Sequence, residues 1–104
     1  MRYKFAVSGA ADQGFCELDA PQKSEEVGRE IIRQGGILIT GATTGVPYLA
    51  AKGANQAGGI SIGFSPAASE AAHKRVYKLP LDEYDVTVFT GFDYSGRNLL
   101  MTRA

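Results

Sequence analysis

The stretch "ILITGATTGVPYLAAKGANQAGG", residues 37–59, decides the fold. Its apolar start, residues 37–40, predicts a buried strand, and a turn rich in glycine and threonine leads from it into a helical segment. Pro47 is compatible with the first turn of that helix, where its missing N–H has no partner to lose. Small residues recur on one helix face and suit it to close packing on a sheet: Leu49, Ala50, Gly53, Ala54 and Ala57.

The same alternation extends in both directions from this unit. Further apolar runs predict strands at residues 3–7, 60–64 and 85–91. Helices are expected from the cap Asp19 to Gly35-Gly36, within residues 67–76, and from Arg97 onward. Continuously apolar strands that alternate with helices indicate a parallel sheet covered on both faces, so the predicted class is a three-layer α/β/α sheet.

The first of these helices has two further expected features. Its apolar stripe consists of Val27, Ile31 and Ile32. Glu25 and Arg29 lie one turn apart, and we expect them to form an ion pair on the exposed face.

Small polar residues follow each predicted strand. The pairs are Ser8-Gly9, Thr40-Gly41, Ser65-Pro66 and Thr90-Gly91. Right-handed connections bring the carboxyl ends of parallel strands to one edge of the sheet. Because ligands of open α/β sheets bind at that edge, the sequence predicts a binding site there.

The turn after the second strand has the composition of an anion site. Gly41 and Gly45 allow the backbone to approach a ligand, and Thr43 and Thr44 supply hydroxyls, one of which is expected to cap the following helix. The first amides of that helix lack internal partners and carry partial positive charge. We therefore predict a phosphate site, to which Ser8, Gly9, Thr90 and Gly91 contribute. Turn and cap chemistry alone would also explain these residues.

Two familiar phosphate motifs are not matched. The P-loop needs a Gly-Lys pair before a hydroxyl residue, which the chain lacks. "TGATTGVP" is close to the Thr-Gly-x-x-x-Gly-x-Gly motif of short-chain dehydrogenases, but Pro47 replaces its last glycine and the motif follows the second strand. No Tyr-x-x-x-Lys pair is present either, so a nicotinamide-dependent reductase remains only an alternative.

Length, charge balance and cysteine count limit the classes of protein to which the chain can belong. The chain has 104 residues, equal numbers of acidic and basic residues, and a single cysteine, Cys16, which excludes an internal disulfide framework. These features predict one domain over residues 1–104, without nucleic-acid or membrane partners. No signal peptide is recognised, so a cytoplasmic location is expected. No residues have metal-ligand spacing, and no cofactor is expected.

The chain resembles the N-terminal portion of the Lonely-guy (LOG) proteins, a Rossmann-like family often mislabelled as lysine decarboxylases. The resemblance rests on "FAVSGA", "GGILITGATTGVPYLAAKGANQAGG", "SIGFSPA" and "VFTGFDYSGRNLLMTRA". It implies a Rossmann-like fold and binding of a nucleotide, in a homo-oligomer. Plant-type members hydrolyse the N-glycosidic bond of nucleoside 5′-monophosphates. The resemblance makes Arg97 a catalytic or substrate-binding cation.

One family motif is not found. The Pro-Gly-Gly-x-Gly-Thr-x-x-Glu signature follows the arginine segment in the family, and it supplies a second phosphate cradle and a catalytic carboxylate. This sequence stops at Ala104, which suggests a fragment, a chain cut at a domain-like boundary, or a natural half. Hydrolase activity is then not expected from these residues alone. The alternative is an interaction module that dimerises or docks through an unpaired edge strand.

Several single residues receive structural interpretations. His73 is expected to be solvated in a short polar helix, and Cys16 to be an ordinary thiol. Asp93 is expected to cap a helix or to pair with Arg97. Tyr48 and Tyr94 follow strand-end turns and could stack on a base, although packing or hydrogen bonding is the favoured role.

Overall fold

The computed structural model describes residues 2–9 and 20–104. It contains β1 (Lys4–Ala6), α1 (Ala20–Arg33), β2 (Ile37–Thr40), α2 (Val46–Gln56), β3 (Ser61–Ser65), α3 (Glu70–Arg75), β4 (Val86–Phe89) and α4 (Asp93–Arg103). The alternation of strands and helices predicted from the sequence is confirmed. The expected cap Asp19 and the thiol of Cys16 lie outside the described residues.

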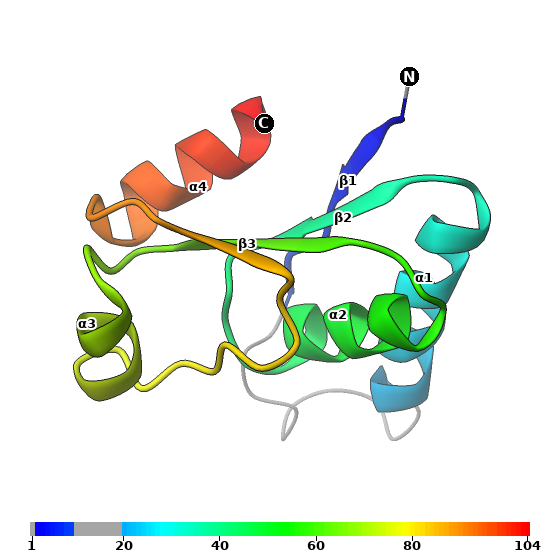
Figure 1. Cartoon of the computed structure of the whole chain (residues 1–104), viewed down its shortest axis with the longest axis horizontal. Helices are drawn as coiled ribbons and strands as arrows, with labels where there is room; N and C mark the ends of the chain where they lie inside the picture. Colours follow the sequence, from blue (N-terminus) through cyan, green and yellow to red (C-terminus); the bar gives the residue numbers. More distant parts are fainter. Residues whose placement is uncertain (1, 10–19) are drawn as a thin grey trace.

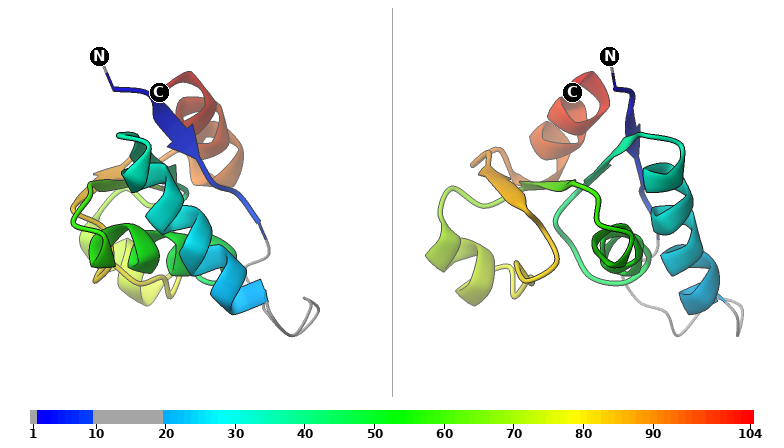
Figure 2. Two further views of the ribbon diagram at one scale, coloured as in Figure 1. Left: turned by 90° about the vertical axis from the view of Figure 1, so that its right-hand side faces the viewer. Right: turned by 45° about the vertical axis from the view of Figure 1, so that its right-hand side comes forward.

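The four strands form one parallel sheet in the order β1-β2-β3-β4. Phe5 is paired with Leu38, Ile39 with Ile62, and Phe64 with Val88. Helices α1 and α2 lie on one face of this sheet and α4 lies on the other, while α3 lies beyond the carboxyl end of β3 (Figures 1 and 2). The three-layer α/β/α arrangement is therefore confirmed.

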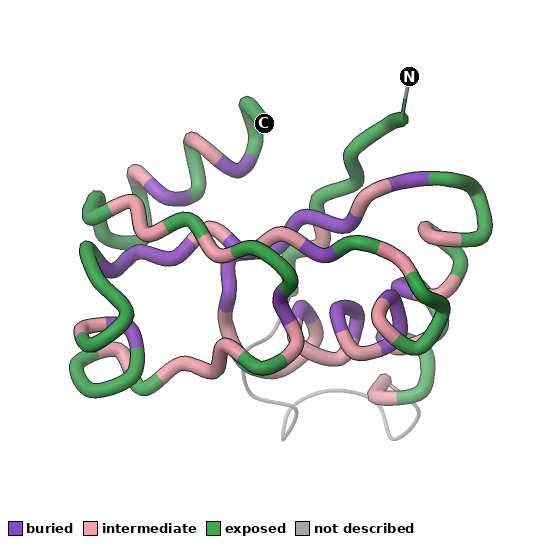
Figure 3. The backbone as a smooth tube through the Cα atoms, in the orientation of Figure 1, coloured by how far each residue is buried: buried purple, intermediate pink, exposed green. Residues whose placement is uncertain are grey.

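Strand β1 differs from its expected environment. Its apolar sequence predicted a buried strand, but Lys4, Phe5 and Ala6 are all exposed. The reason is the strand order, which places β1 at one edge of the sheet and β4 at the other. The buried stretches of the chain lie instead in β2, β3 and the facing side of α2 (Figure 3).

Helices α1 and α2 meet backbone to backbone. A side chain on Gly28 would overlap the main-chain carbonyl of Ala50, and one on Gly53 would overlap that of Glu25. The small-residue face of α2 thus packs against α1 as well as against the sheet, which was the only partner expected. Beneath it lies the core, made of Leu38, Ala42, Ala50, Ala51, Ala54 and Tyr84.

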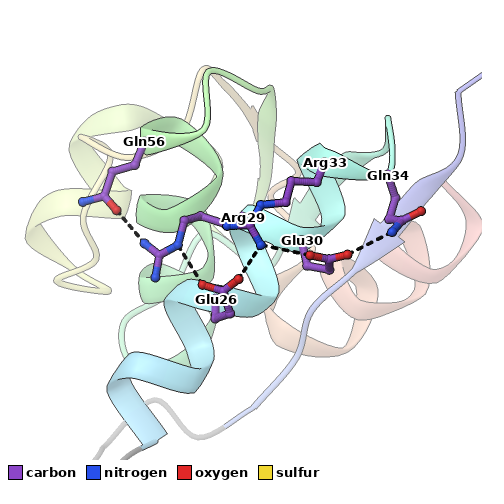
Figure 4. A network of polar contacts seen from close by, with 6 residues as sticks. All are labelled: Glu26, Arg29, Glu30, Arg33, Gln34 and Gln56. Atoms are coloured by element: carbon purple, nitrogen blue, oxygen red, sulfur yellow. Dashed lines mark hydrogen bonds and ion pairs between the residues drawn. The ribbon is translucent and has the colours of Figure 1, made fainter.

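The exposed face of α1 carries a network of charged side chains (Figure 4). Arg29 pairs with Glu26, at 3.0 Å, and also bonds to Gln56 on α2. The predicted pair of Glu25 with Arg29 is therefore wrong. Glu25 instead faces Lys52 of α2 at 3.5 Å, because it lies on the side of α1 that contacts α2.

Candidate anion-binding site

The loop between β2 and α2 adopts backbone conformations that side chains rarely tolerate. Ala42 has a φ of 54°, and Gly45 combines a φ of 79° with a ψ of −137°. Two contacts hold the loop in place. The Ala42 N–H donates to the Thr40 hydroxyl at 3.1 Å, and the Tyr84 hydroxyl donates to the Thr43 carbonyl at 2.8 Å. Burial raises the pKa of Tyr84 to about 12, so its hydroxyl remains a neutral donor at physiological pH.

Helix α2 begins without a capping side chain. Gly45 occupies the N-cap position, so the predicted cap by Thr43 or Thr44 is wrong. The extended turn around Gly45 puts a residue without a hydroxyl at that position. The early amides of α2 have no intrahelical acceptors, and they carry the positive end of the helix dipole.

Arg97 of α4 lies close to this helix start. It is only 7% exposed, and its guanidinium donates to the main-chain carbonyls of Gly41 and Phe64. Its Nε has no hydrogen-bond partner. Among residues 2–9 and 20–104, no carboxylate forms an ion pair with Arg97. Burial lowers the pKa of Arg97, as expected for a desolvated cation that lacks a counter-charge.

The expected partner of Arg97 points elsewhere. Asp93 begins α4 and accepts a hydrogen bond from the hydroxyl of Tyr77, so the predicted pair of Asp93 with Arg97 is wrong. The ring of Tyr94 contacts Arg97 instead, with 5.3 Å between the guanidinium carbon and the ring centroid. A cation held by carbonyls and an aromatic ring keeps its full positive charge.

A cavity of about 210 Å³ opens in front of Arg97, and we call it the Arg97 pocket. It gathers residues from the ends of β1 and β2, from the start of α2 and from α4. Its polar and turn residues are Ser8, Gly9, Gly41, Thr43, Tyr94, Arg97 and Asn98. No Asp or Glu of the described residues lines it. The pocket therefore offers one buried cation, hydroxyls, an amide side chain and a helix start.

Five of the residues predicted to form the site line this pocket, and four do not. Ser8, Gly9, Gly41, Thr43 and Arg97 meet there, although they come from three separate parts of the chain. Gly45 is the N-cap of α2 and does not line the pocket, and Thr44 lines another hollow. Thr90 and Gly91 instead bond to the carbonyls of Ser65 and Ala67. Asn98 was not anticipated, since nothing in its sequence context distinguishes it from a surface amide.

His73 also differs from its prediction. It is fully buried rather than solvated, because the segment after α3 folds over it. Its Nε2 lies 2.9 Å from the carbonyl oxygen of Pro80, which can only accept. In the neutral imidazole Nδ1 is therefore the acceptor, and the Ser65 hydroxyl donates a hydrogen bond to it at 2.6 Å.

The described part of the chain has neither a cluster of metal ligands nor a membrane-spanning helix. No cluster of three or more His, Cys, Asp or Glu side chains could hold a metal ion there. None of its helices has the length and apolar character needed to cross a bilayer.

Solved structures with the same arrangement of strands and helices are available for comparison. The molybdenum cofactor binding protein of the phototrophic bacterium Rippkaea orientalis superposes with a TM-score of 0.81 at 25% identity, over 99% of this chain and 58% of that protein. The molybdenum cofactor carrier protein of Chlamydomonas reinhardtii gives 0.69 at 28% identity, over 88% of this chain and 50% of that protein. The structural-genomics target TM1055 gives 0.75 at 23% identity, which shows the fold.

The match to TM1055 covers 99% of this chain and 56% of that protein, so the chain spans little more than half the length of such structures. A comparison with curated proteins gives no match. The model of the SLOG cluster4 family matches residues 2–104. The predicted likeness to LOG proteins is thus confirmed at the level of the wider LOG/SLOG group, and the chain belongs to the SLOG cluster4 family of Rossmann-like proteins.

Proposed function

We propose that the chain binds a small organic phosphate in the Arg97 pocket. The observation that carries this proposal is a buried guanidinium for which the described residues provide neither a partner for Nε nor a carboxylate in an ion pair. An isolated buried charge is unfavourable unless something compensates it. A phosphate would supply the missing negative charge and would accept from Arg97 and from the uncapped start of α2.

The rest of the ligand is a planar heterocycle in this proposal. A volume of about 210 Å³ holds a phosphate and part of a sugar or ring, but not a whole nucleotide. The ring would then extend toward Tyr94, which is 49% exposed and can stack on it. A nucleoside 5′-monophosphate, the ligand class implied by the LOG resemblance, has this form.

The structural neighbours suggest a second ligand with the same chemistry. The molybdenum cofactor, named for two of them, is a pterin that carries a phosphate, and the protein would hold it as cargo. The Arg97 pocket fits that phosphate for the same reason that it fits a nucleotide phosphate. The two ligands differ in their rings, so competition between them distinguishes the candidates.

Binding is favoured over hydrolysis for the residues described. N-glycosidic hydrolysis by the LOG route needs a carboxylate near the sugar, and no carboxylate of residues 2–9 or 20–104 lines the Arg97 pocket. Arg97 could stabilise developing charge, which would be its catalytic role if a carboxylate were supplied from elsewhere. We therefore expect the described residues to bind a nucleotide without hydrolysing its N-glycosidic bond.

The test is thermal unfolding with AMP, inorganic phosphate and adenosine at millimolar concentrations. Preferential binding to the folded state raises the melting temperature, and we expect AMP to act more strongly than phosphate and adenosine to act least. Arg97→Met should remove the response to AMP. Lys23→Met is a control that loses one charge on α1. Equal shifts with AMP and adenosine, or an unchanged response in Arg97→Met, would overturn the proposal.

A second candidate function rests on β1. No strand of the described residues pairs with its outer edge, and a nearly apolar hollow of about 250 Å³ lies beside it, lined by Phe5, Val27 and Ile31 among others. A second copy of the chain fits this surface, because two copies with zero net charge do not repel each other over long range. Val27→Asp should then convert a dimer into a monomer in light scattering, whereas Glu70→Ala should not.

A further inference from the structure

The hollow next to the Arg97 pocket has the features of a second anion site. It has a volume of about 490 Å³ and is lined by Thr44, Tyr48, Lys74, Lys78, Leu79 and Pro80. We call it the Lys78 hollow. Consecutive residues connect it to the Arg97 pocket, since Thr43 lines one and Thr44 the other. Both sites therefore border the start of α2.

The wall that carries the lysines is fixed from inside the protein. The fully buried His73 bonds to the carbonyl of Pro80 through its side chain, and its own carbonyl accepts from the N–H of Leu79 at 3.0 Å. Ser65 at the end of β3 holds the other ring nitrogen. Through His73, hydrogen bonds thus connect the segment from α3 to Pro80 to the end of β3.

The opposite wall is attached to the same segment. The Tyr48 hydroxyl donates to the carboxylate of Asp82 at 2.8 Å, and this bond raises the pKa of Tyr48 to about 12. Asp82 is therefore already engaged in holding the two walls together, and it does not line the hollow. The start of α2 and the segment after α3 keep a fixed separation as a result.

The charge that faces the hollow is positive. Within the described residues, Lys78 forms no ion pair with a carboxylate. Lys74 pairs with Glu70 at 3.2 Å on the same helix, but both side chains are more than half exposed, so this pair is weak. Lys78 also has a φ of 56°, a conformation that is unfavourable for a residue with a side chain and common for glycine. A lysine in this unfavourable conformation suggests that its charge has a functional role.

We propose that the Lys78 hollow binds a second phosphate of the same ligand, so that the preferred ligands are nucleoside diphosphates or larger pyrophosphate-bearing molecules. The inference rests on the proposed function, because the first phosphate is assigned to the Arg97 pocket. One phosphate faces Arg97 and the other faces Lys74 and Lys78, and both lie against the start of α2. The protein would then discriminate ligands by their number of phosphates.

The experiment compares the affinities of AMP and ADP by isothermal titration calorimetry on the whole chain. ADP should bind about five- to tenfold more tightly than AMP, the effect of one added hydrogen bond of ordinary strength. In Lys74→Met/Lys78→Gly this advantage should fall below twofold while AMP affinity stays unchanged. The glycine relieves the backbone conformation of Lys78, so loss of folding does not confuse the result. Arg75→Met, which removes a charge from α3 outside the hollow, should keep the advantage.

The outcomes separate the two proposals. If AMP binds but ADP binds no more tightly, the second site is wrong and the Arg97 pocket stands. If the double variant keeps the full preference for ADP, the second phosphate lies elsewhere and the Lys78 hollow is again wrong. If neither nucleotide binds while the molybdenum cofactor or inorganic phosphate does, the nucleotide ligand fails, whereas the phosphate site remains.

Discussion

The guanidinium of Arg97 donates a hydrogen bond to the main-chain carbonyl of Gly41, which lies 56 residues earlier in the chain. This contact joins α4, on one face of the sheet, to the turn that leads into α2 on the other. Gly41 has no room for a side chain, because a Cβ there would overlap the guanidinium. Arg97 can therefore keep this position only while residue 41 has no side chain.

Gly41→Ala tests this dependence. The added methyl group should displace Arg97 and lower the free energy of unfolding by about 1–3 kcal/mol, the usual cost of overpacking. In an Arg97→Ala background the same change should cost much less, because the overlapping atoms are gone. Urea unfolding of the four variants gives the coupling between the two sites. Additive effects would mean that the methyl group is accommodated in some other way.

Gly45→Ala tests the start of α2. The backbone of Gly45 has a positive φ and an extended ψ, a region essentially restricted to glycine, so alanine should destabilise the fold by about 1–3 kcal/mol. It should also reduce the thermal shift with AMP, since the helix start would move. Gly58→Ala is the matched control, because Gly58 has a φ of 78° and open space around it. It should destabilise the protein yet leave the ligand response unchanged.

Gly28→Ala and Gly53→Ala test the contact between α1 and α2. In an exposed helix, replacing glycine by alanine gains about 1 kcal/mol. Here each methyl group would overlap a main-chain carbonyl of the facing helix, so we expect a loss of about 1–3 kcal/mol or more. Chemical denaturation measures the sign directly. Glu30→Ala on the exposed face of α1 should change stability by less than about 0.5 kcal/mol.

Ser65→Ala, His73→Ala and the double variant test the buried pair beneath α3. Loss of His73 creates a cavity and leaves the Ser65 hydroxyl without its acceptor, so about 2–4 kcal/mol should be lost. Ser65→Ala alone should cost less, about 1–2 kcal/mol. The double-mutant cycle should show a coupling of at least about 0.5 kcal/mol. A coupling near zero would contradict the direct bond between the two side chains.

The raised pKa of Tyr84 predicts that the free energy of unfolding decreases at alkaline pH. Its pKa is raised to about 12 by burial, against about 10 in an unfolded chain, so the folded state holds the proton more tightly. That contribution is fully present below pH 10 and is lost as the pH rises from 10 toward 12. Tyr84→Phe should flatten this decline while losing the bond to Thr43. Urea midpoints at pH 9, 10 and 11 provide the measurement, and an equally steep decline in the variant would exclude Tyr84 as its source.

The sequence predicted the alternation of strands and helices because each apolar run is bounded by glycine or proline. It also predicted that Ser8, Thr43 and Arg97 contribute to one site, and they do share one pocket, because parallel strands end at a common edge. What those residues bind is still a prediction. The strand order was not predictable from local pattern, and it made β1 an exposed edge.

The remaining differences have tertiary causes. His73 looked solvated because its neighbours on α3 are polar, yet the segment ending at Pro80 folds over it. The threonines of the turn looked like helix caps, but the backbone of Gly45 takes that position. Asp93 was expected either to cap a helix or to pair with Arg97, but Phe92 is the N-cap of α4 and Arg97 contacts Gly41 at a distant strand end. Contacts between segments far apart in sequence leave no local signal.

The position of α4 opposite α1 and α2 has a practical consequence. Because α4 starts at the carboxyl edge and runs back over the sheet, the start of β1 and the end of α4 lie on the same side of the molecule (Figure 1). Ser8 and Gly9 of the Arg97 pocket lie beyond the far end of β1, whereas α4 ends less than one turn after Met101, which lines the pocket. An affinity tag, fluorophore or surface anchor should therefore be attached ahead of β1 rather than after α4, so that titrations on immobilised protein leave the pocket open to solvent.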